Sequence, residues 1–307
     1  MNLEDAIESL CTSYSPKELK KAFFDLSDRY RSKKAHETEL HRIAYLATRL
    51  PATCAVLKRV FSEISLPPTI IDCGAGPGTS IWALLDQPIS SLTLIEQDHE
   101  FVKLGKKMSP ESPFVTTWKT QSFLDLKESA DLILFSYSLN EIPEKYLEEV
   151  IKRAHTLTHN YLVIVEPGTP EGFERIRRIR TALLNLRMSL HAPCPHHNKC
   201  PMVGGDWCHF STRLPRTSLH RFLKEGSLGY EDEKYSYLIA SKEPYTPSGA
   251  RILRHPLKRK GHTIATLCTE KGLIQKTFTG KERKKIKSGD NFVLAEFGQL
   301  FGNSPPV

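Results

Sequence analysis

The feature that most constrains the fold is a short apolar segment that runs directly into three alternating glycines. Thr69–Cys73 has the length and composition of a buried strand, and Gly74, Gly76 and Gly78 follow it. Glycine allows a tight turn and the close approach of a ligand to the backbone. The residues after the turn have the apolar spacing of a helix through Leu85. Strand and helix continue to alternate up to residue 167, which predicts an open α/β sheet.

An acidic residue ends the next predicted strand. Residues 92–95 form this strand, and Glu96 follows it, at the position where such sheets hold the ribose diol of a nucleoside. The strand, the glycine loop, the helix and Glu96 together resemble the S-adenosylmethionine loop of class I methyltransferases. The alternative is a glycine-rich turn that binds no ligand. The resemblance implies a set of cofactor-binding residues: Asp72, Gly74, Gly76, Gly78 and Glu96.

Three polar residues farther along are candidates for the same site. Asp125 lies about where these domains place a polar residue beside adenine, although a surface acid in a loop is the alternative. Residues 136–143 follow the strand at residues 131–135, at the carboxyl edge where ligands gather. They lack the Asn/Asp-Pro-Pro-aromatic run of amino-methylating enzymes. Asn140 and Tyr137 are the catalytic candidates there, and no base or nucleophile is evident.

The seven cysteines fall into two groups. Cys11, Cys54 and Cys73 lie in apolar patterns and are predicted to be small core residues. Three others lie within fifteen residues in a loop rich in proline and glycine, and a seventh lies far away on a predicted strand at residues 262–269. Four thiolates suit an iron–sulfur cluster or a zinc ion. The second group consists of Cys194, Cys200, Cys208 and Cys268.

The spacing of these cysteines favours a [4Fe–4S] cluster over the alternatives. The steps of six and eight residues are longer than those of most structural zinc sites, and Cys-Pro pairs occur beside iron–sulfur clusters. Zinc is the second interpretation, since four histidines lie close by in the sequence, and unliganded thiols are the third. These histidines are His191, His196, His197 and His209.

Charge is distributed unevenly along the chain. The net charge is +8, yet residues 171–307 hold 24 Lys and Arg against 12 Asp and Glu. The first 170 residues hold 19 basic and 23 acidic residues. Basic residues gather on a helix predicted from Glu171 to Leu190 and in runs at residues 251–260 and 281–287. This asymmetry predicts a nucleic-acid face in the C-terminal half, with an ordinary solvated surface as the alternative.

Composition and termini set further expectations. No apolar run approaches the roughly 20 residues of a membrane span, so no membrane partner is expected. The acidic N-terminus resembles neither a signal nor a transit peptide, which predicts a cytoplasmic protein without a removed leader. We predict four parts: an N-terminal helical segment at 1–65, a cofactor domain at 66–190, a basic cysteine-cluster module at 191–295 and a tail at 296–307.

Several of these motifs together resemble the Rsm-type mitochondrial small-ribosomal-subunit methyltransferase-like proteins and their bacterial relatives. The resemblance rests on residues 49–53, 72–78, 166–168, 194–210 and 254–268. It implies a class I methyltransferase domain that binds S-adenosylmethionine, and association with the small ribosomal subunit and its rRNA. It also implies a [4Fe–4S] cluster ligated by Cys194, Cys200, Cys208 and Cys268.

The resemblance leaves two functions open. One is a methyltransferase acting on small-subunit rRNA, and the other is a non-catalytic rRNA-binding assembly factor. We expect the protein to be monomeric apart from the ribosome. Because the sequence shows no transit peptide, it is similar to bacterial members that act in the cytosol. The cluster is expected to be structural, since all four expected positions are cysteine and none is left open for radical chemistry.

Overall fold

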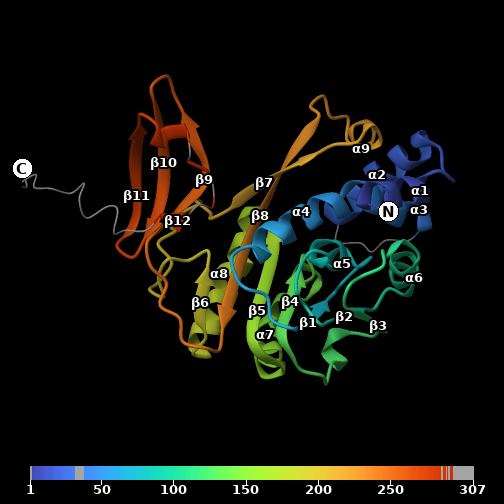
Figure 1. Ribbon diagram of the computed structural model, residues 1–307, viewed down its shortest axis with the longest axis horizontal. Helices are drawn as coiled ribbons and strands as arrows, with labels where there is room; N and C mark the ends of the chain where they lie inside the picture. Colours follow the sequence, from blue (N-terminus) through green and yellow to red (C-terminus); the bar gives the residue numbers. More distant parts are fainter. Residues whose placement is uncertain (1, 32–37, 285, 288, 290, 293–307) are drawn as a thin grey trace, which may run out of the picture. The chain divides into compact units, whose positions relative to one another are not determined.

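The computed structural model describes residues 2–31, 38–284, 286, 287, 289, 291 and 292, which form two compact units (Figure 1). The first unit comprises Met1–Tyr146, Leu157–His159 and Thr212–Glu233. The second comprises Leu147–Thr156, Asn160–Ser211 and Lys234–Val307. The predicted tail at 296–307 lies outside the described residues.

Four helices open the first unit: α1 (Leu3–Cys11), α2 (Pro16–Arg31), α3 (Glu39–Thr48) and α4 (Leu50–Phe61). The Ser-Pro pair at residues 15 and 16 predicts a helix cap, and it is present: the Ser15 hydroxyl accepts a hydrogen bond from the Glu18 amide while the Glu18 carboxylate accepts one from the Ser15 amide. The Thr38 hydroxyl caps α3 by accepting a hydrogen bond from the His41 amide. The apolar spacing predicts the start of this helix at about His36, which lies outside the described residues.

The sheet of the first unit is parallel. Its strands are β1 (Thr69–Cys73), β2 (Ser91–Glu96), β3 (Val115–Thr120) and β4 (Ala130–Ser136), in the order β3-β2-β1-β4. The helices α5 (Thr79–Leu84) and α6 (His99–Met108) lie between strands in the sequence. This order is that of one half of a Rossmann-like fold, which confirms the predicted α/β sheet. The apolar residues of β1 and β4 are buried and form its core.

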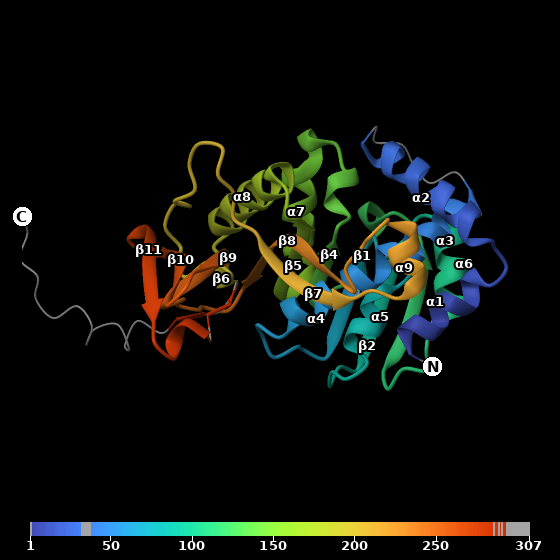
Figure 2. The ribbon, with the colours of Figure 1, turned by 90° about the horizontal axis from the view of Figure 1, so that it is seen from above.

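Shorter elements complete the first unit. They are η1 (Phe123–Asp125), η2 (Leu139–Glu141), η3 (Glu144–Tyr146) and α9 (Ser218–Leu223). Helix α9 packs against α2 and α3, as Figure 2 shows. The compact units therefore follow different boundaries from those drawn on the sequence. The N-terminal helices belong with the parallel sheet, and a segment from the C-terminal half joins them because α9 covers their apolar surface.

The second unit contains helix α8 (Pro170–Asn185), strand β6 (Ser189–Ala192) and most of α7 (Leu147–Leu157), β5 (Thr158–Pro167) and β8 (Tyr230–Ser241). Strand β7 (Phe210–Pro215) begins in this unit, and its residues from Thr212 onward belong to the first. Strands β5 and β6 both pair antiparallel with β8. The helix predicted to reach Leu190 ends at Asn185, which is a correction. Arg187 adopts a φ of 62° and reverses the chain, so that residues 189–192 pair as a strand instead.

A four-stranded antiparallel sheet forms the C-terminal part of the second unit. Its order is β11-β10-β9-β12, from β9 (Ala250–Lys258), β10 (His262–Thr269), β11 (Gly272–Thr279) and β12 (Asn291–Phe292), with η4 (Glu282–Lys284) beside it. The predicted hairpin of β10 and β11 is confirmed. No helix in the described part of the chain has the length and apolar character needed to cross a membrane.

Candidate cofactor loop and four-cysteine centre

The three loop glycines differ in what surrounds them. All have positive φ: 74° at Gly74, 54° at Gly76 and 79° at Gly78. A Cβ atom at Gly74 would lie 2.4 Å from the Ser138 Cβ, and one at Gly78 would lie 2.8 Å from the Trp118 ring. At Gly76 no atom of the described residues would lie within 4 Å. Packing therefore requires glycine at the first and third positions, while the middle one faces open space.

Glu96 ties the end of β2 to this loop. Its Oε2 accepts a hydrogen bond from the Gly76 amide at 2.8 Å, and its Oε1 accepts one from the Asp98 amide at 2.7 Å. Each carboxylate oxygen has a second lone-pair direction, so both can accept a further donor. Burial raises the pKa of Glu96. A paired hydroxyl donor such as a ribose diol suits this carboxylate, and its role in binding one stays a prediction.

Asp72 lies beneath the loop and is almost completely buried. Its Oδ2 accepts a hydrogen bond from the Ser80 hydroxyl at 2.5 Å, which joins β1 to α5. Its Oδ1 is buried without a hydrogen-bond partner among the described residues. Burial raises the pKa of Asp72 to about 7. The structure therefore places Asp72 behind the glycine turn, with one carboxyl oxygen still able to form a hydrogen bond.

The remaining candidates of the first unit lie in different environments. Asp125 is exposed at the end of η1, and its role beside adenine stays a prediction. Asn140 lies in η2, which follows the carboxyl end of β4, and its Oδ1 is buried without a partner among the described residues. The Tyr137 backbone has a φ of 58°. The catalytic roles of Asn140 and Tyr137 stay predictions.

Two residues near this edge were missed by the sequence reasoning as site residues. The Ser138 hydroxyl donates to the Cys73 carbonyl at 2.7 Å and fills the space beside Gly74. Arg49 lies over the Tyr137 ring at 5.8 Å and donates two hydrogen bonds to Glu233, at 2.8 and 3.1 Å. Only the motif at residues 49–53 pointed to Arg49. Its partner lies in a distant part of the sequence.

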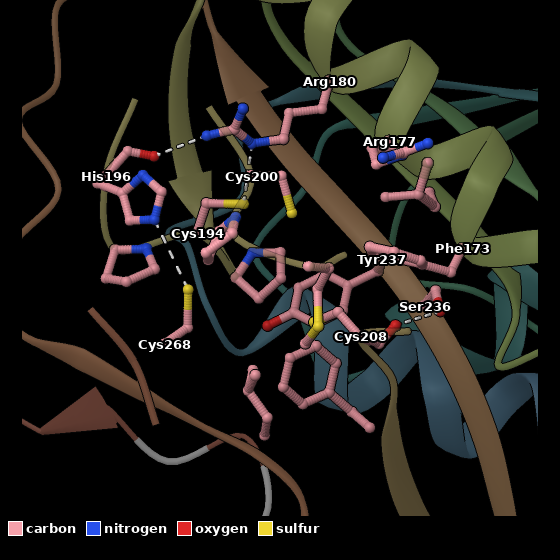
Figure 3. A pocket seen from close by; sticks show the side chains of 17 residues that line it. Phe173, Arg177, Arg180, Cys194, His196, Cys200, Cys208, Ser236, Tyr237 and Cys268 are labelled. Carbon is pink, nitrogen blue, oxygen red and sulfur yellow. Dashed lines mark hydrogen bonds between the residues drawn. The ribbon is translucent and has the colours of Figure 1, made fainter. Parts of the chain in front are cut away.

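The four cysteines of the second group line one cavity of about 40 Å³ in the second unit (Figure 3). Three come from the loop between β6 and β7, and Cys268 comes from β10. Its sulfur lies 3.6 Å from the Nε2 of His196. Apolar side chains, including Phe173, Ile176 and Met202, line much of the rest of this cavity. Cys11, Cys54 and Cys73 are separately buried, which confirms their assignment as core residues.

Two buried arginines hold the cysteine loop. Arg180 of α8 donates to the Cys194 sulfur at 3.3 Å and to the His196 carbonyl at 3.1 Å (Figure 3). It also donates to the Asn198 carbonyl at 2.6 Å. Arg251 of β9 donates to the Pro193 carbonyl at 3.1 Å and to the Gly289 carbonyl at 2.6 Å. The sequence had suggested a basic surface for Arg180, but the structure buries it.

Further hydrogen bonds shape the same loop. The Trp207 indole donates to the Gly168 carbonyl at 3.0 Å, and the Ser236 hydroxyl donates to the Cys208 carbonyl at 2.8 Å. Arg254 pairs with both carboxylate oxygens of Asp206 at 2.8 Å. The loop is therefore held at several points along its length, although it contains neither helix nor strand.

The electrostatics of this cavity oppose free thiolates. Burial raises the pKa of Cys194 and Cys208, and it raises the pKa of Cys268 to about 12. These thiols hold their protons at neutral pH unless a cation replaces them. Among the residues that the structure describes, no group of three or more His, Cys, Asp or Glu side chains is arranged to hold a single metal ion.

Comparison with known proteins places the chain in a family. The family model for the mitochondrial small ribosomal subunit protein Rsm22 matches residues 39–301, which is most of the chain. The chain belongs to the Rsm22 family. Human mitochondrial ribosome assembly protein METTL17 is 27% identical over 268 residues, covering 78% of this chain and 57% of METTL17. A mitochondrial Rsm22-cox11 tandem protein of Schizosaccharomyces pombe is 27% identical, covering 81% and 41%.

This Rsm22-family chain thus spans about half the length of these relatives. Solved structures with a similar arrangement include magnesium protoporphyrin IX methyltransferase from Synechocystis, at 13% identity and a TM-score of 0.44 over 70% of this chain and 93% of that enzyme. Another is a putative RNA methyltransferase from Pyrococcus horikoshii, at 14% identity and a TM-score of 0.42 over 62% and 84%.

Proposed function

We propose that this Rsm22-family chain binds S-adenosylmethionine and acts on, or assembles, the small ribosomal subunit as a methyltransferase-like protein. The observation that carries the proposal is the hydrogen bond between Glu96 and the Gly76 amide. It places an acid with spare acceptor capacity beside a loop whose middle glycine faces open space. A sulfonium nucleoside with a ribose diol fits these features, and methyl transfer from it depends largely on positioning.

The ribosomal part of the proposal is supported by family membership. METTL17 is named as a mitochondrial ribosome assembly protein, and the family model is described by the mitochondrial small ribosomal subunit. We propose small-subunit rRNA as the partner, since the C-terminal half carries the excess of basic residues. The relatives are named as mitochondrial proteins. The cytoplasmic location and the monomeric state of this chain stay predictions.

A non-catalytic assembly factor is the second candidate, and one observation favours it. Residues 136–143 lack the amine-binding run of amino-methylating enzymes. Among the described residues the Asn140 Oδ1 is buried without a partner, and it is one acceptor in η2 that a target amine could use. Methyl incorporation into assembling small subunits, compared between the wild type and Gly76→Arg, separates the two functions. Equal incorporation by both proteins would remove the enzyme and leave the assembly factor.

We further propose that the four cysteines hold a structural [4Fe–4S] cluster. Each thiolate of such a cluster binds a different iron, so its ligands are spread more widely than those around one ion. What supports the proposal is that all four thiols line one cavity. Burial raises the pKa of Cys194, and the positive charges of Arg180 and Arg251 oppose this rise and so reduce the cost of its thiolate.

Substitution of Glu96 tests the cofactor assignment. Glu96→Gln removes the negative charge and replaces one accepting oxygen by an NH2 group that can only donate. S-adenosylmethionine should therefore bind at least about tenfold more weakly, as for loss of hydrogen bonds to a charged group. Titration calorimetry with the wild type and the variant measures this change. The same measurement on Asp125→Asn tests the predicted adenine contact. Wild-type affinity in Glu96→Gln would contradict the assignment.

Anaerobic purification tests the metal centre. The intact protein should be coloured, with visible absorbance of an iron–sulfur cluster and about four iron atoms per chain. Cys208→Ser should lose this absorbance, while Cys54→Ser should keep it because Cys54 is a core residue of the first unit. A colourless protein that contains zinc would replace the cluster with the second interpretation.

A further inference from the structure

A second, larger cavity in the second unit lies next to the cysteine centre. It is a groove of about 680 Å³ between α7, α8 and the loop that carries Cys200. Five cationic side chains and two carboxylates line it. The cationic residues are Lys152, Arg177, Arg178, Arg180 and Lys199. The groove is therefore positively charged and falls within the usual volume range of binding pockets, about 300–1,000 Å³.

The positions of these residues follow from helical spacing. Glu174, Arg177, Arg178 and Thr181 recur at the three- and four-residue steps that place side chains on one face of α8. Lys199 reaches the groove from the cysteine loop and Lys152 from α7, and both are exposed. Figure 3 shows Arg177 and Arg180 on α8 near Cys200. Arg180 and Cys200 line both the groove and the cysteine cavity.

We infer that this groove binds the sugar–phosphate backbone of RNA, an inference that rests on the proposed function. Guanidinium and ammonium groups are the side chains that bind phosphate oxygens most strongly. The described residues that line the groove include no Phe, Tyr or Trp. His197 is the aromatic residue in this lining, and the five cationic side chains outnumber it, so the groove contacts mainly the backbone, independently of sequence.

One ion pair in the groove has a carboxylate that a phosphate can replace. Arg177 donates two hydrogen bonds to Glu174, each 2.9 Å long. Both side chains are nearly half exposed, at 44% and 48%, and such surface pairs contribute little to stability. A phosphate can therefore take the place of the Glu174 carboxylate at a small cost. Arg180, by contrast, is held by the cysteine loop and supplies a fixed positive charge at the base of the groove.

The test uses the full chain with its metal centre and a short single-stranded RNA of mixed sequence, alongside oligouridylate of equal length. Lys152→Ala/Lys199→Ala removes two exposed charges without disturbing the Arg180 contacts. Each lost phosphate contact should weaken binding roughly five- to tenfold at about 50 mM salt. The slope of log affinity against log salt should become shallower by about 0.7 per contact, or about 1.4 for the double variant. Fluorescence anisotropy measures both. Both RNAs should respond alike.

The matched control is Lys103→Ala/Lys107→Ala, which removes two exposed charges from α6 of the first unit. It should bind RNA like the wild type. Iron content equal to that of the wild type shows that the groove variant keeps its centre. If the wild type binds RNA and the groove variant binds equally well, the groove assignment is overturned and the ribosomal proposal stands.

Two further outcomes complete the test. Failure of the wild type to bind either RNA would count against the ribosomal partner as well as the groove. A polyglutamate peptide stands for an acidic protein segment. If the groove variant loses affinity for that peptide but not for RNA, the groove belongs to a protein partner and the RNA assignment is overturned.

Discussion

At the scale of single residues, two glycines in one loop have different roles. A methyl group at Gly74 meets the Ser138 Cβ at 2.4 Å as well as an unfavourable φ, whereas a methyl group at Gly76 meets only the unfavourable φ. Gly74→Ala should therefore cost about 3 kcal/mol of stability and Gly76→Ala about 1 kcal/mol. Urea unfolding of the two variants measures the difference. Equal losses of stability would mean that Ser138 moves aside without destabilising the fold.

The Asp72 carboxyl makes stability depend on pH. Its pKa is about 7 in the folded chain, because of burial, and about 4 in the unfolded chain. The folded state binds more protons between these values, so the contribution of Asp72 to stability is full below pH 4 and is lost as pH rises to 7.

Replacing Asp72 removes this contribution. Asp72→Asn should lose less stability than the wild type between pH 4 and pH 8, by a few kcal/mol at most. Unfolding by urea at several pH values measures it, and Asp125→Asn at the exposed end of η1 is the control. The stability of Asp72→Asn should still depend on pH to some extent, because burial also raises the pKa of Glu166 to about 7. A pH dependence identical to that of the wild type would contradict the buried, protonated carboxyl.

At the scale of elements, α8 carries the side chain that organises the cysteine loop. Arg180 is 4% exposed and makes three hydrogen bonds to that loop. Arg180→Met keeps the volume but leaves two carbonyls unpaired, so the second unit should lose about 3 kcal/mol of stability and retain less iron. Thermal unfolding and metal analysis measure these changes. Thr181→Ala, on the exposed side of α8, is the control.

Full iron content and an unchanged unfolding midpoint in Arg180→Met would mean that the backbone alone holds the loop. This outcome is worth testing, because Trp207 and Ser236 also anchor the loop. The comparison therefore separates the contribution of one buried charge from that of the neutral hydrogen bonds.

At the scale of the whole molecule, the two compact units should respond differently to loss of the metal centre. The cysteines and the arginines that hold them all belong to the second unit, while the glycine loop and Glu96 belong to the first. Metal binding to four thiols is also folding free energy. Chelation should therefore increase hydrogen exchange across residues 193–208 and leave affinity for S-adenosylmethionine within about twofold of its original value.

Hydrogen exchange followed by mass spectrometry, together with calorimetry on the same samples, tests this independence. Loss of cofactor affinity in parallel with loss of iron would show that the two sites are coupled. The same experiment on Cys208→Ser avoids any direct effect of the chelator on the first unit.

The sequence predicted much of the local structure. The capping box at Ser15, the glycine turn after β1 and the β10–β11 hairpin each depend on backbone conformation and on contacts a few residues apart. Such contacts can be recognised from residue type and spacing. Where the local pattern changed from helix to strand after Asn185, the apolar spacing continued and concealed the change, so the predicted helix was too long.

By itself, the sequence determined which residues turn, which alternate and which three cysteines share one loop, because these properties are carried by short stretches of chain. Only the tertiary structure decided that Cys268 shares a cavity with the loop cysteines, that Arg180 is buried beneath them, and that Gly74 and Gly76 have unequal surroundings. Each of these outcomes depends on segments far apart in the sequence packing together. The register and direction of that packing are set by the whole fold, and no local pattern records them.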